Sequence, residues 1–220
     1  MNPRMRFSDR ADAGRRLAAV LQGLDLLSPV IYALPRGGVP VAFEVAAVLK
    51  APLELLLVRK LGAPNQPELA VGAIVDGADP EVVLNEEIVA ATGADAAYLA
   101  HVRAEALREI ERRRSVYLGE RSSVDPAGRD AIIIDDGIAT GATVLAAVRA
   151  LRRRKARRVF VATAVAPPET VARLEREADE VICLAKPEAF AGVSAFYSDF
   201  HQLDDGEVIA LLDAARERSS

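Results

Sequence analysis

Two neighbouring acids, Asp135 and Asp136, end an apolar run and are followed by a short loop of small residues. The loop closes in the pattern Thr-Gly-x-Thr, where a helix is predicted over about 142–155. Its residues are Gly137, Ile138, Ala139, Thr140, Gly141, Ala142 and Thr143. Unpaired N–H groups in the first turn of a helix attract phosphate, and two carboxylates can accept hydrogen bonds from vicinal ribose hydroxyls. An acidic pair alone proves little, but the whole succession of strand, acids, loop and helix is a much more specific indication of a phosphorylated ribose as ligand.

The side chains of the loop add to its suitability for an anion. Gly137 and Gly141 permit close approach and unusual dihedral angles, and the hydroxyls of Thr140 and Thr143 are further donors. A Walker loop would need a Gly-Lys-Ser/Thr ending, and a dinucleotide fingerprint would need Gly-x-Gly-x-x-Gly after the first strand. Neither pattern is present, so a nucleoside triphosphatase or a dehydrogenase is a weak interpretation.

Two further segments carry charge that suits an anionic ligand. Arg36, Gly37 and Gly38 lie in a turn after the first predicted strand, where the glycine N–H groups and a forked guanidinium can face an anion. Arg59 and Lys60 end another strand and precede a segment rich in Gly, Pro and Asn, residues 61–68. Taken alone, Arg-Gly-Gly is an ordinary turn, and residues 61–68 fit either a mobile lid or a solvated hairpin.

Together these motifs resemble the type I phosphoribosyltransferase family over about residues 30–75 and 130–184. The resemblance implies a Rossmann-like α/β fold, a parallel sheet flanked by helices with a small helical hood, and phosphoribosyl pyrophosphate (PRPP) as ligand. It implies that residues 137–143 bind the 5′-phosphate and that Arg36, Gly37 and Gly38 bind the pyrophosphate. It also implies catalytic roles for Lys60, Arg59, Asp135 and Asp136. Magnesium is the implied cofactor, carried by PRPP near the two acids rather than held by a set of protein ligands.

The implied reaction displaces pyrophosphate from C1 of PRPP by a nitrogen nucleophile, through a transition state with oxocarbenium character. The acceptor is expected to be a small molecule, a nucleobase, but its identity stays open. In 6-oxopurine transferases the loop has a third acid where this chain has Ala139, and Ala-Thr-Gly looks more like the adenine or uracil enzymes. Two alternatives remain, a weakly active or inactive PRPP-sensing regulator of the same fold and a hydrolase or phosphorylase of another ribose phosphate.

The C-terminal segment, residues 185–220, is a candidate for the acceptor side. Four of its residues, Phe190, Phe196, Tyr197 and Phe200, are among only ten Phe and Tyr residues in the chain. We expect that Phe196 or Tyr197 stacks on a base, as hoods in this family do. Aromatic packing beneath a last helix, residues 205–215, is the ordinary alternative.

Apolar runs alternate with helical patterns, which predicts a parallel sheet covered on both faces within one domain, residues 1–220. Strands are predicted at 30–34, 53–58, 70–75, 131–135, 159–165 and 180–184; helices are predicted after Ser8 or Asp9 and at 39–50, 142–155, 169–178 and 205–215. Residues 77–130 break the rhythm with a short strand at 82–84 and a long helix at 95–117, whose apolar face is Leu99, Val102, Ala106 and Ile110. We interpret them as a hood, the alternative being packing against the sheet or a partner subunit.

Composition narrows the class of protein. The chain has 220 residues, 51% of them hydrophobic, which suffices for one substantial core. A net charge of -4 and a pI near 5.4 argue against a nucleic-acid surface, and the basic run 152–155 fits a helix end. One cysteine, Cys183, in a strand-like run, and two histidines offer no zinc site. Without an apolar stretch near ~20 residues or a signal core, we expect a cytoplasmic protein away from membranes. Family habit suggests a homodimer.

Overall fold

The computed structural model describes residues 6–76, 80–117, 119 and 123–219. Its main sheet has five strands in the order β2-β1-β6-β7-β8, and every pairing in it is parallel. The strands are β1 (Val30–Ala33), β2 (Leu53–Leu55), β6 (Asp130–Asp135), β7 (Arg158–Val165) and β8 (Glu180–Ala185). This arrangement confirms the predicted Rossmann-like α/β core, and its strand bounds differ from the predicted ones by one residue, except at the end of β2.

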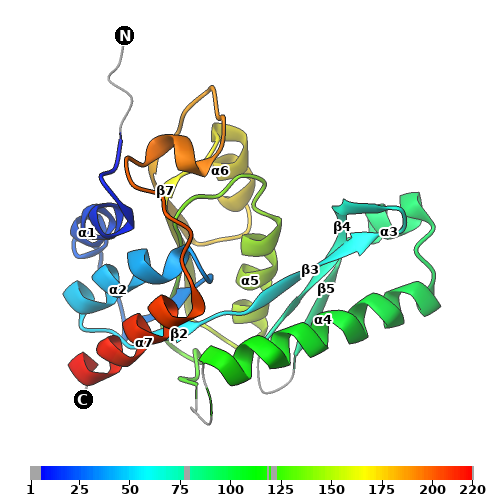
Figure 1. The fold of residues 1–220 in the computed structure, drawn as a ribbon, viewed down its shortest axis with the longest axis horizontal. Helices are drawn as coiled ribbons and strands as arrows, with labels where there is room; N and C mark the ends of the chain where they lie inside the picture. Colours follow the sequence, from blue (N-terminus) through cyan, green and yellow to red (C-terminus); the bar gives the residue numbers. More distant parts are fainter. Residues whose placement is uncertain (1–5, 77–79, 118, 120–122, 220) are drawn as a thin grey trace.

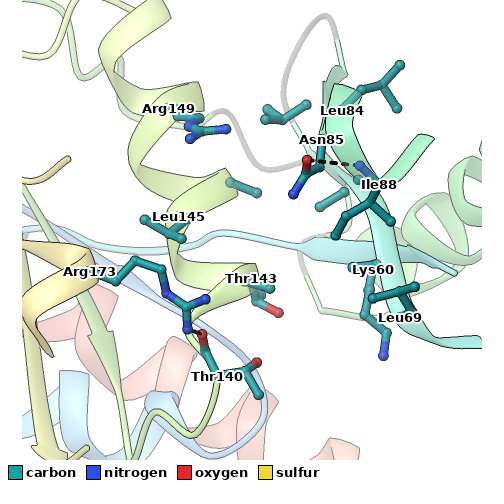
Figure 2. Close-up of a pocket in the computed structure, with 16 residues that line it drawn as sticks. Lys60, Leu69, Leu84, Asn85, Ile88, Thr140, Thr143, Leu145, Arg149 and Arg173 are labelled. Carbon is teal, nitrogen blue, oxygen red and sulfur yellow. Dashed lines mark hydrogen bonds between the residues drawn. The ribbon is translucent and has the colours of Figure 1, made fainter. Parts of the chain in front are cut away.

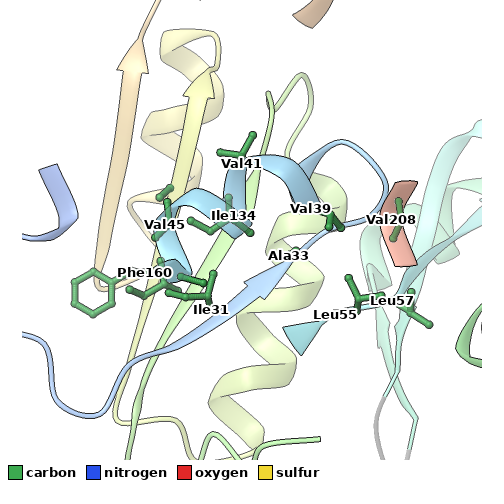
Figure 3. Close-up of a cluster of buried hydrophobic side chains, with 14 of the residues drawn as sticks. Ile31, Ala33, Val39, Val41, Val45, Leu55, Leu57, Ile134, Phe160 and Val208 are labelled. Carbon is green, nitrogen blue, oxygen red and sulfur yellow. The ribbon is translucent and has the colours of Figure 1, made fainter. Parts of the chain in front are cut away.

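Helices cover both faces of this sheet, as Figure 1 shows. On one face lie α1 (Arg10–Leu21), α2 (Gly38–Leu49) and α7 (Asp205–Ser219); on the other lie α5 (Ala142–Arg153) and α6 (Pro168–Leu174). Because side chains alternate along a strand, Ile31 and Ala33 point into the α2 layer while Val30 and Tyr32 point toward α5. Figure 3 shows the first of these clusters between α2, α7 and the sheet. Helices bury both faces of the sheet, which explains why its strands are apolar at nearly every position.

The helix ends follow local chemistry. Of the two residues predicted to cap α1, Asp9 is the cap, since its carboxylate accepts the N–H of Asp12 at 2.7 Å. The basic run after α5 is a helix end: Arg152 donates to the carbonyl of Glu177 at 2.8 Å and pairs with Asp179 at 3.1 Å. These contacts fit the predicted role of the run in the solvated end of a helix.

A second unit projects from the main sheet (Figure 1). It holds an antiparallel sheet, β3-β4-β5, and two helices. Its elements are β3 (Val58–Ala63), β4 (Gln66–Val75), β5 (Glu81–Leu84), α3 (Glu86–Thr92) and α4 (Ala96–Tyr117). The predicted hood, 77–130, begins too late, because β5 pairs with β4 and β4 with β3, so the unit starts at Val58. The short strand predicted at 82–84 is β5, and α3 was not predicted.

Residues 53–75 correct one part of the prediction and decide between two alternatives in another. The single strand expected at 53–58 is divided, since β2 ends at Leu55 and Val58 already belongs to the other sheet. The segment 61–68, for which a mobile lid and a hairpin were the two alternatives, is the hairpin of β3 and β4 with a turn at Pro64 and Asn65. Asn65 has φ of 60°, a left-handed conformation that asparagine tolerates. Pro64 and Asn65 correctly indicate a turn, but residues 66–75 pair with β3, so the segment is a hairpin rather than a flexible loop.

The long helix α4 packs by its predicted face. Ala106 and Ile110 are buried, and Leu99 and Val102 are half-buried against the core. Tyr98 donates its hydroxyl to the carbonyl of Gly62 at 2.9 Å, which joins α4 to β3. The helix therefore lies along the sheet of its own unit, in agreement with the packing alternative stated for it.

Asp130 at the start of β6 gives a first testable prediction. Its side chain is 0% exposed, pairs with Arg158 at 2.6 Å and accepts the N–H of Leu27 at 2.7 Å. Burial alone would raise the pKa of Asp130, but these hydrogen bonds and the charges of Arg158 and Arg157 hold that pKa below its usual range. Asp130→Asn should lower the free energy of unfolding by about 2 kcal/mol at pH 7.

The pH dependence of this loss has a definite sign. A carboxyl with a lowered pKa stabilises the fold above its ordinary pKa of about 3.9, and that contribution is lost as the pH falls through the folded-state pKa. Urea unfolding should therefore show the difference between wild type and Asp130→Asn shrinking below about pH 4. The exposed Glu188→Gln is the control; a loss for Asp130→Asn that is constant with pH would contradict the explanation.

Candidate functional site

The loop after β6 is held by one of its N–H groups and by two of its carbonyl groups. The N–H of Ile138 donates to the carbonyl of Val165 at 2.9 Å, at the end of the neighbouring strand β7. Thr170 of α6 donates its hydroxyl to the carbonyl of Ala139 at 2.6 Å, and Arg173 donates to the carbonyl of Thr140. The main chain of the loop is thus fastened to β7 and α6, which leaves the N–H groups after Ile138 for a ligand.

The N–H groups of this loop are available. Within the described residues, the N–H groups of Ala139, Thr140 and Gly141 donate to no protein group. Gly141 has φ of 74°, the left-handed conformation that favours glycine, and stands directly before α5. Thr140 is exposed and Thr143 half-buried. Free amides at the start of a helix, beside two hydroxyls, form the anion cradle expected from the sequence.

The two acids lie in different environments. Asp135 is partly exposed and accepts the N–H of Asp136 at 2.9 Å. Asp136 is only 8% exposed, and its carboxylate pairs with Arg10 at 2.7 Å. Burial and the neighbouring charge of Asp136 raise the pKa of Asp135 well above its usual range. The pair is therefore asymmetric, with the Asp136 charge already neutralised by a cation from α1.

The turn that holds Gly37 and Gly38 packs directly against this acidic loop. A Cβ atom at Gly38 would lie 2.5 Å from the carbonyl of Ile134, and one at Gly37 would lie 2.2 Å from the carboxylate of Asp136. Any larger residue would push the two loops apart, so both glycines are explained by close approach. The structure thus places the predicted pyrophosphate turn beside the acidic pair.

Arg36, from the same turn, already has partners. It donates to the carbonyl of Leu203 at 3.1 Å and pairs with Asp205 at 3.1 Å, and the hydroxyl of Tyr117 donates to Asp205 at 2.5 Å. These contacts join the turn to the start of α7 and the end of α4. A ligand that recruits Arg36 must compete with Asp205.

Lys60 lines a cavity of about 420 Å³ between α5 and the second unit. The same cavity is lined by Thr140 and Thr143 of the loop, and Figure 2 shows Lys60 on the side opposite α5. Arg149 and Arg173 add positive charge to its walls. Arg59 is exposed and does not line the cavity, because successive side chains of β3 point to opposite faces. The structure therefore brings Lys60, and not Arg59, to the phosphate loop.

Comparison with known proteins identifies the family to which this domain belongs. The model of the phosphoribosyl transferase domain matches residues 8–201, which includes the acidic loop, the glycine turn and Lys60. The chain belongs to this family. No helix among the described residues is both long enough and apolar enough to cross a bilayer.

Individual relatives of this phosphoribosyltransferase domain agree with the family assignment. A Mycobacterium tuberculosis (strain H37Rv) protein that bears the provisional name of phosphoribosyl transferase is 49% identical over 209 residues, 95% of this chain and 47% of that protein. The chain therefore spans about half the length of the curated relatives it matches first. The crystal structure of TT1426 from Thermus thermophilus is 44% identical, with a TM-score of 0.81 over 94% of this chain and 98% of that one. A uracil phosphoribosyltransferase of Nocardioides is 37% identical over 73 residues, 33% of this chain and 34% of that protein.

The aromatic residues of the C-terminal segment are used for packing in this domain. Phe196 is 7% exposed and stacks on Phe190, with ring centroids 6.0 Å apart. Tyr197 is 2% exposed, packs against Phe7 and Phe200, and donates its hydroxyl to the carbonyl of Asp136 at 2.6 Å. Neither ring offers an open face for a base, so this arrangement favours the packing alternative. The contact with Asp136 nevertheless places the segment against the acidic loop.

Sequence reasoning missed several residues of the site. They are Arg10, Tyr117, Thr170, Arg173 and Val193; the last would contact a Cβ atom at Gly137 within 2.5 Å. All except Thr170 and Arg173 lie more than 50 residues from their partners in the sequence. Arg10 in particular resembles any surface cation in the first turn of a helix, so only the three-dimensional structure reveals its position.

The fit of a magnesium ion can be judged from the donor atoms. Among the residues that the structure describes, no group of three or more His, Cys, Asp or Glu side chains could hold a metal. Carboxylate oxygens are nevertheless the ligands that magnesium prefers, and magnesium commonly uses one or two of them together with substrate phosphates. Asp135, partly exposed at the end of β6, supplies such an oxygen. The residues fit an ion that is shared with a phosphorylated ligand.

Proposed function

We propose that this chain binds PRPP and transfers its phosphoribosyl group to a ring nitrogen of a nucleobase, with release of pyrophosphate. The observation that carries the proposal is the loop 137–143, whose free N–H groups and threonine hydroxyls lie directly beyond Asp135 and Asp136. A phosphate and a ribose diol joined as in PRPP match this order of donors and acceptors. Membership of the family supports the same reaction.

The parts of PRPP have separate partners in this proposal. The 5′-phosphate accepts hydrogen bonds from Ala139, Thr140 and Gly141 N–H groups and from the hydroxyls of Thr140 and Thr143. The ribose hydroxyls donate to the acidic pair, with Asp135 the more accessible carboxylate. The diphosphate lies against the turn of Gly37 and Gly38, and Arg36 joins it after exchanging its partner Asp205. Lys60 approaches from the second unit.

The chemical step follows from these contacts. The C1–O bond to pyrophosphate breaks, positive charge develops on the ribose ring, and the acceptor nitrogen forms the new C1–N bond and gives up its proton. Asp135 and Asp136 stabilise the charge on the ring, while Arg36 and Lys60 stabilise the charge on the departing diphosphate. Magnesium, when bound with PRPP, would neutralise part of the diphosphate charge. No covalent attachment to the protein is needed.

The class of acceptor and the assembly are further parts of the proposal. Ala139 puts a methyl group where a third acid would manage the proton of a 6-oxopurine, which favours an adenine-like or uracil-like acceptor. The adjoining wall is residues 190–197, of which Val193 packs on Gly137. We also propose a homodimer and a cytosolic location, on the habit of the family.

Calorimetric titration with PRPP and magnesium tests the proposal, followed by a pyrophosphate-release screen over purine and pyrimidine bases. We expect binding that requires the loop and release that depends on the base. The double variant Thr140→Val and Thr143→Val keeps the side-chain shapes without the hydroxyls and should weaken binding about tenfold. Binding without release for any base would indicate a PRPP-sensing regulator instead, and no binding by wild type would overturn the proposal.

A further inference from the structure

Arg10 is a buried cation that the proposed reaction does not use. It lies in the first turn of α1 and is 8% exposed. Removing a guanidinium from water is costly unless a partner compensates for it, and the partner here is the carboxylate of Asp136, 2.7 Å from Nε. Asp136 itself is 8% exposed, so the ion pair is enclosed on both sides.

Arg10 makes two further contacts, both with residues 197–201, which we call the capping segment. Its Nη1 donates to the carbonyl of His201 at 2.9 Å, and its guanidinium lies 3.9 Å from the ring centroid of Phe200. Tyr197 of the same segment donates to the carbonyl of Asp136 at 2.6 Å. Asp136 is therefore joined to the capping segment twice, through its main chain by Tyr197 and through its side chain by Arg10.

The position of the Asp136 carboxylate depends on this cation. The carboxylate lies against Gly37 on one side and next to the acid Asp135 in the chain. Without Arg10, two neighbouring carboxylates would share a poorly hydrated site, and repulsion would turn one of them away. That turn would disturb the contact with Gly37 and so the spacing between the acidic loop and the glycine turn.

We propose that Arg10 is a positioning residue that fixes Asp136 for ribose binding and fastens the capping segment over the acidic loop. This inference rests on the proposed function and adds a residue to it. Arg10 thereby joins the acidic loop, which binds the ribose in the proposed function, to the capping segment. Arginine suits the task better than lysine, because its planar fork reaches Asp136 and His201 together and stacks on Phe200.

The test compares variants of Arg10 by calorimetric titration with PRPP and magnesium. Arg10→Met should raise the Kd by at least about tenfold, and Arg10→Lys, which keeps the charge, should recover part of the loss. Arg16→Met is the matched control on the same helix, since Arg16 pairs with the nearby Asp12 and its side chain is 43% exposed. Its Kd should stay within about twofold of wild type.

Two further measurements separate positioning from a merely structural role. Asp136→Asn and Arg10→Met should not add in their effects on the Kd, because both break one pair. Tyr197→Phe, a conservative change that tests the same unit if Arg10→Met does not fold, should raise the Kd severalfold. A wild-type Kd in well-folded Arg10→Met, or in Tyr197→Phe where Arg10→Met does not fold, would overturn this inference alone. Failure of wild type to bind PRPP would overturn the proposed function and this inference with it.

Discussion

Replacing Asp135 with asparagine should weaken the binding of PRPP and magnesium by more than about tenfold, without lowering the stability of the protein. The loss arises because Asp135 is the more accessible acceptor for the ribose hydroxyls and for a shared cation. Stability should stay or rise, because partial burial and the neighbouring charge of Asp136 raise the pKa of Asp135 and make its charged form unfavourable. Titration calorimetry and thermal unfolding of the same preparations measure the two effects.

The effect of Asp135→Asn on stability should depend on pH, and this dependence tests the explanation given for it. The folded protein holds the Asp135 proton more tightly than the unfolded chain, since the pKa of Asp135 is raised by burial and by Asp136. The stabilisation is complete below the ordinary pKa of about 3.9 and is lost as the pH rises through the folded-state pKa. The Asn variant has no such loss, so its advantage in unfolding free energy should grow with pH. An Asn variant that is less stable than wild type at neutral pH would contradict this explanation.

Lys60→Ala should lower kcat by about a hundredfold and change the Kd for PRPP by less than about threefold. Lys60 lies across the cavity from the phosphate loop, on the second unit. In the proposed function its charge stabilises the departing diphosphate, so its removal should slow the chemical step more than it weakens the binding of PRPP. Steady-state kinetics with the acceptor found in the release screen gives kcat, and calorimetry gives the Kd.

The control for Lys60 removes a cation of the same unit away from the cavity. Arg108→Ala on the exposed side of α4 alters the net charge equally and should leave both constants within about twofold of wild type. Equal losses in kcat for both variants would show a general effect of charge rather than a local one. An unchanged kcat for Lys60→Ala would remove Lys60 from the mechanism.

The acidic loop was predictable because its information is local. An apolar strand, two acids, small residues and a helix follow one another within about 25 residues, and each step restricts the next. The strand, the loop and the start of α5 consequently lie where the sequence places them. The position of the glycine turn was predicted correctly, but the reason for its glycines was not. Close packing against Ile134 and Asp136 explains why Gly37 and Gly38 are glycines.

The parts that were not predictable depend on distant pairing. Arg10 and Asp136 are 126 residues apart, and no sequence pattern in either segment indicates that they form an ion pair. The choice between a mobile lid and a hairpin for residues 61–68 could not be made locally, because the hairpin of β3 and β4 depends on cross-strand bonds and on α4. Phe196 and Tyr197 were candidates for stacking on a base because aromatic residues are useful there, yet the structure buries them against Phe190, Phe7 and Phe200.

Lys60 sits on a paired strand, and this changes what closing the site would involve. An unstructured lid loses conformational entropy of roughly 1–2 kcal/mol per residue each time it becomes ordered. Residues 58–75 already have fixed backbone dihedral angles in the hairpin, so that entropy was lost when the protein folded. Bringing Lys60 to a ligand would instead require the sheet β3-β4-β5 to move with its strand pairings intact. The cost of bringing Lys60 to a ligand would therefore come from moving a paired sheet rather than from ordering a flexible loop.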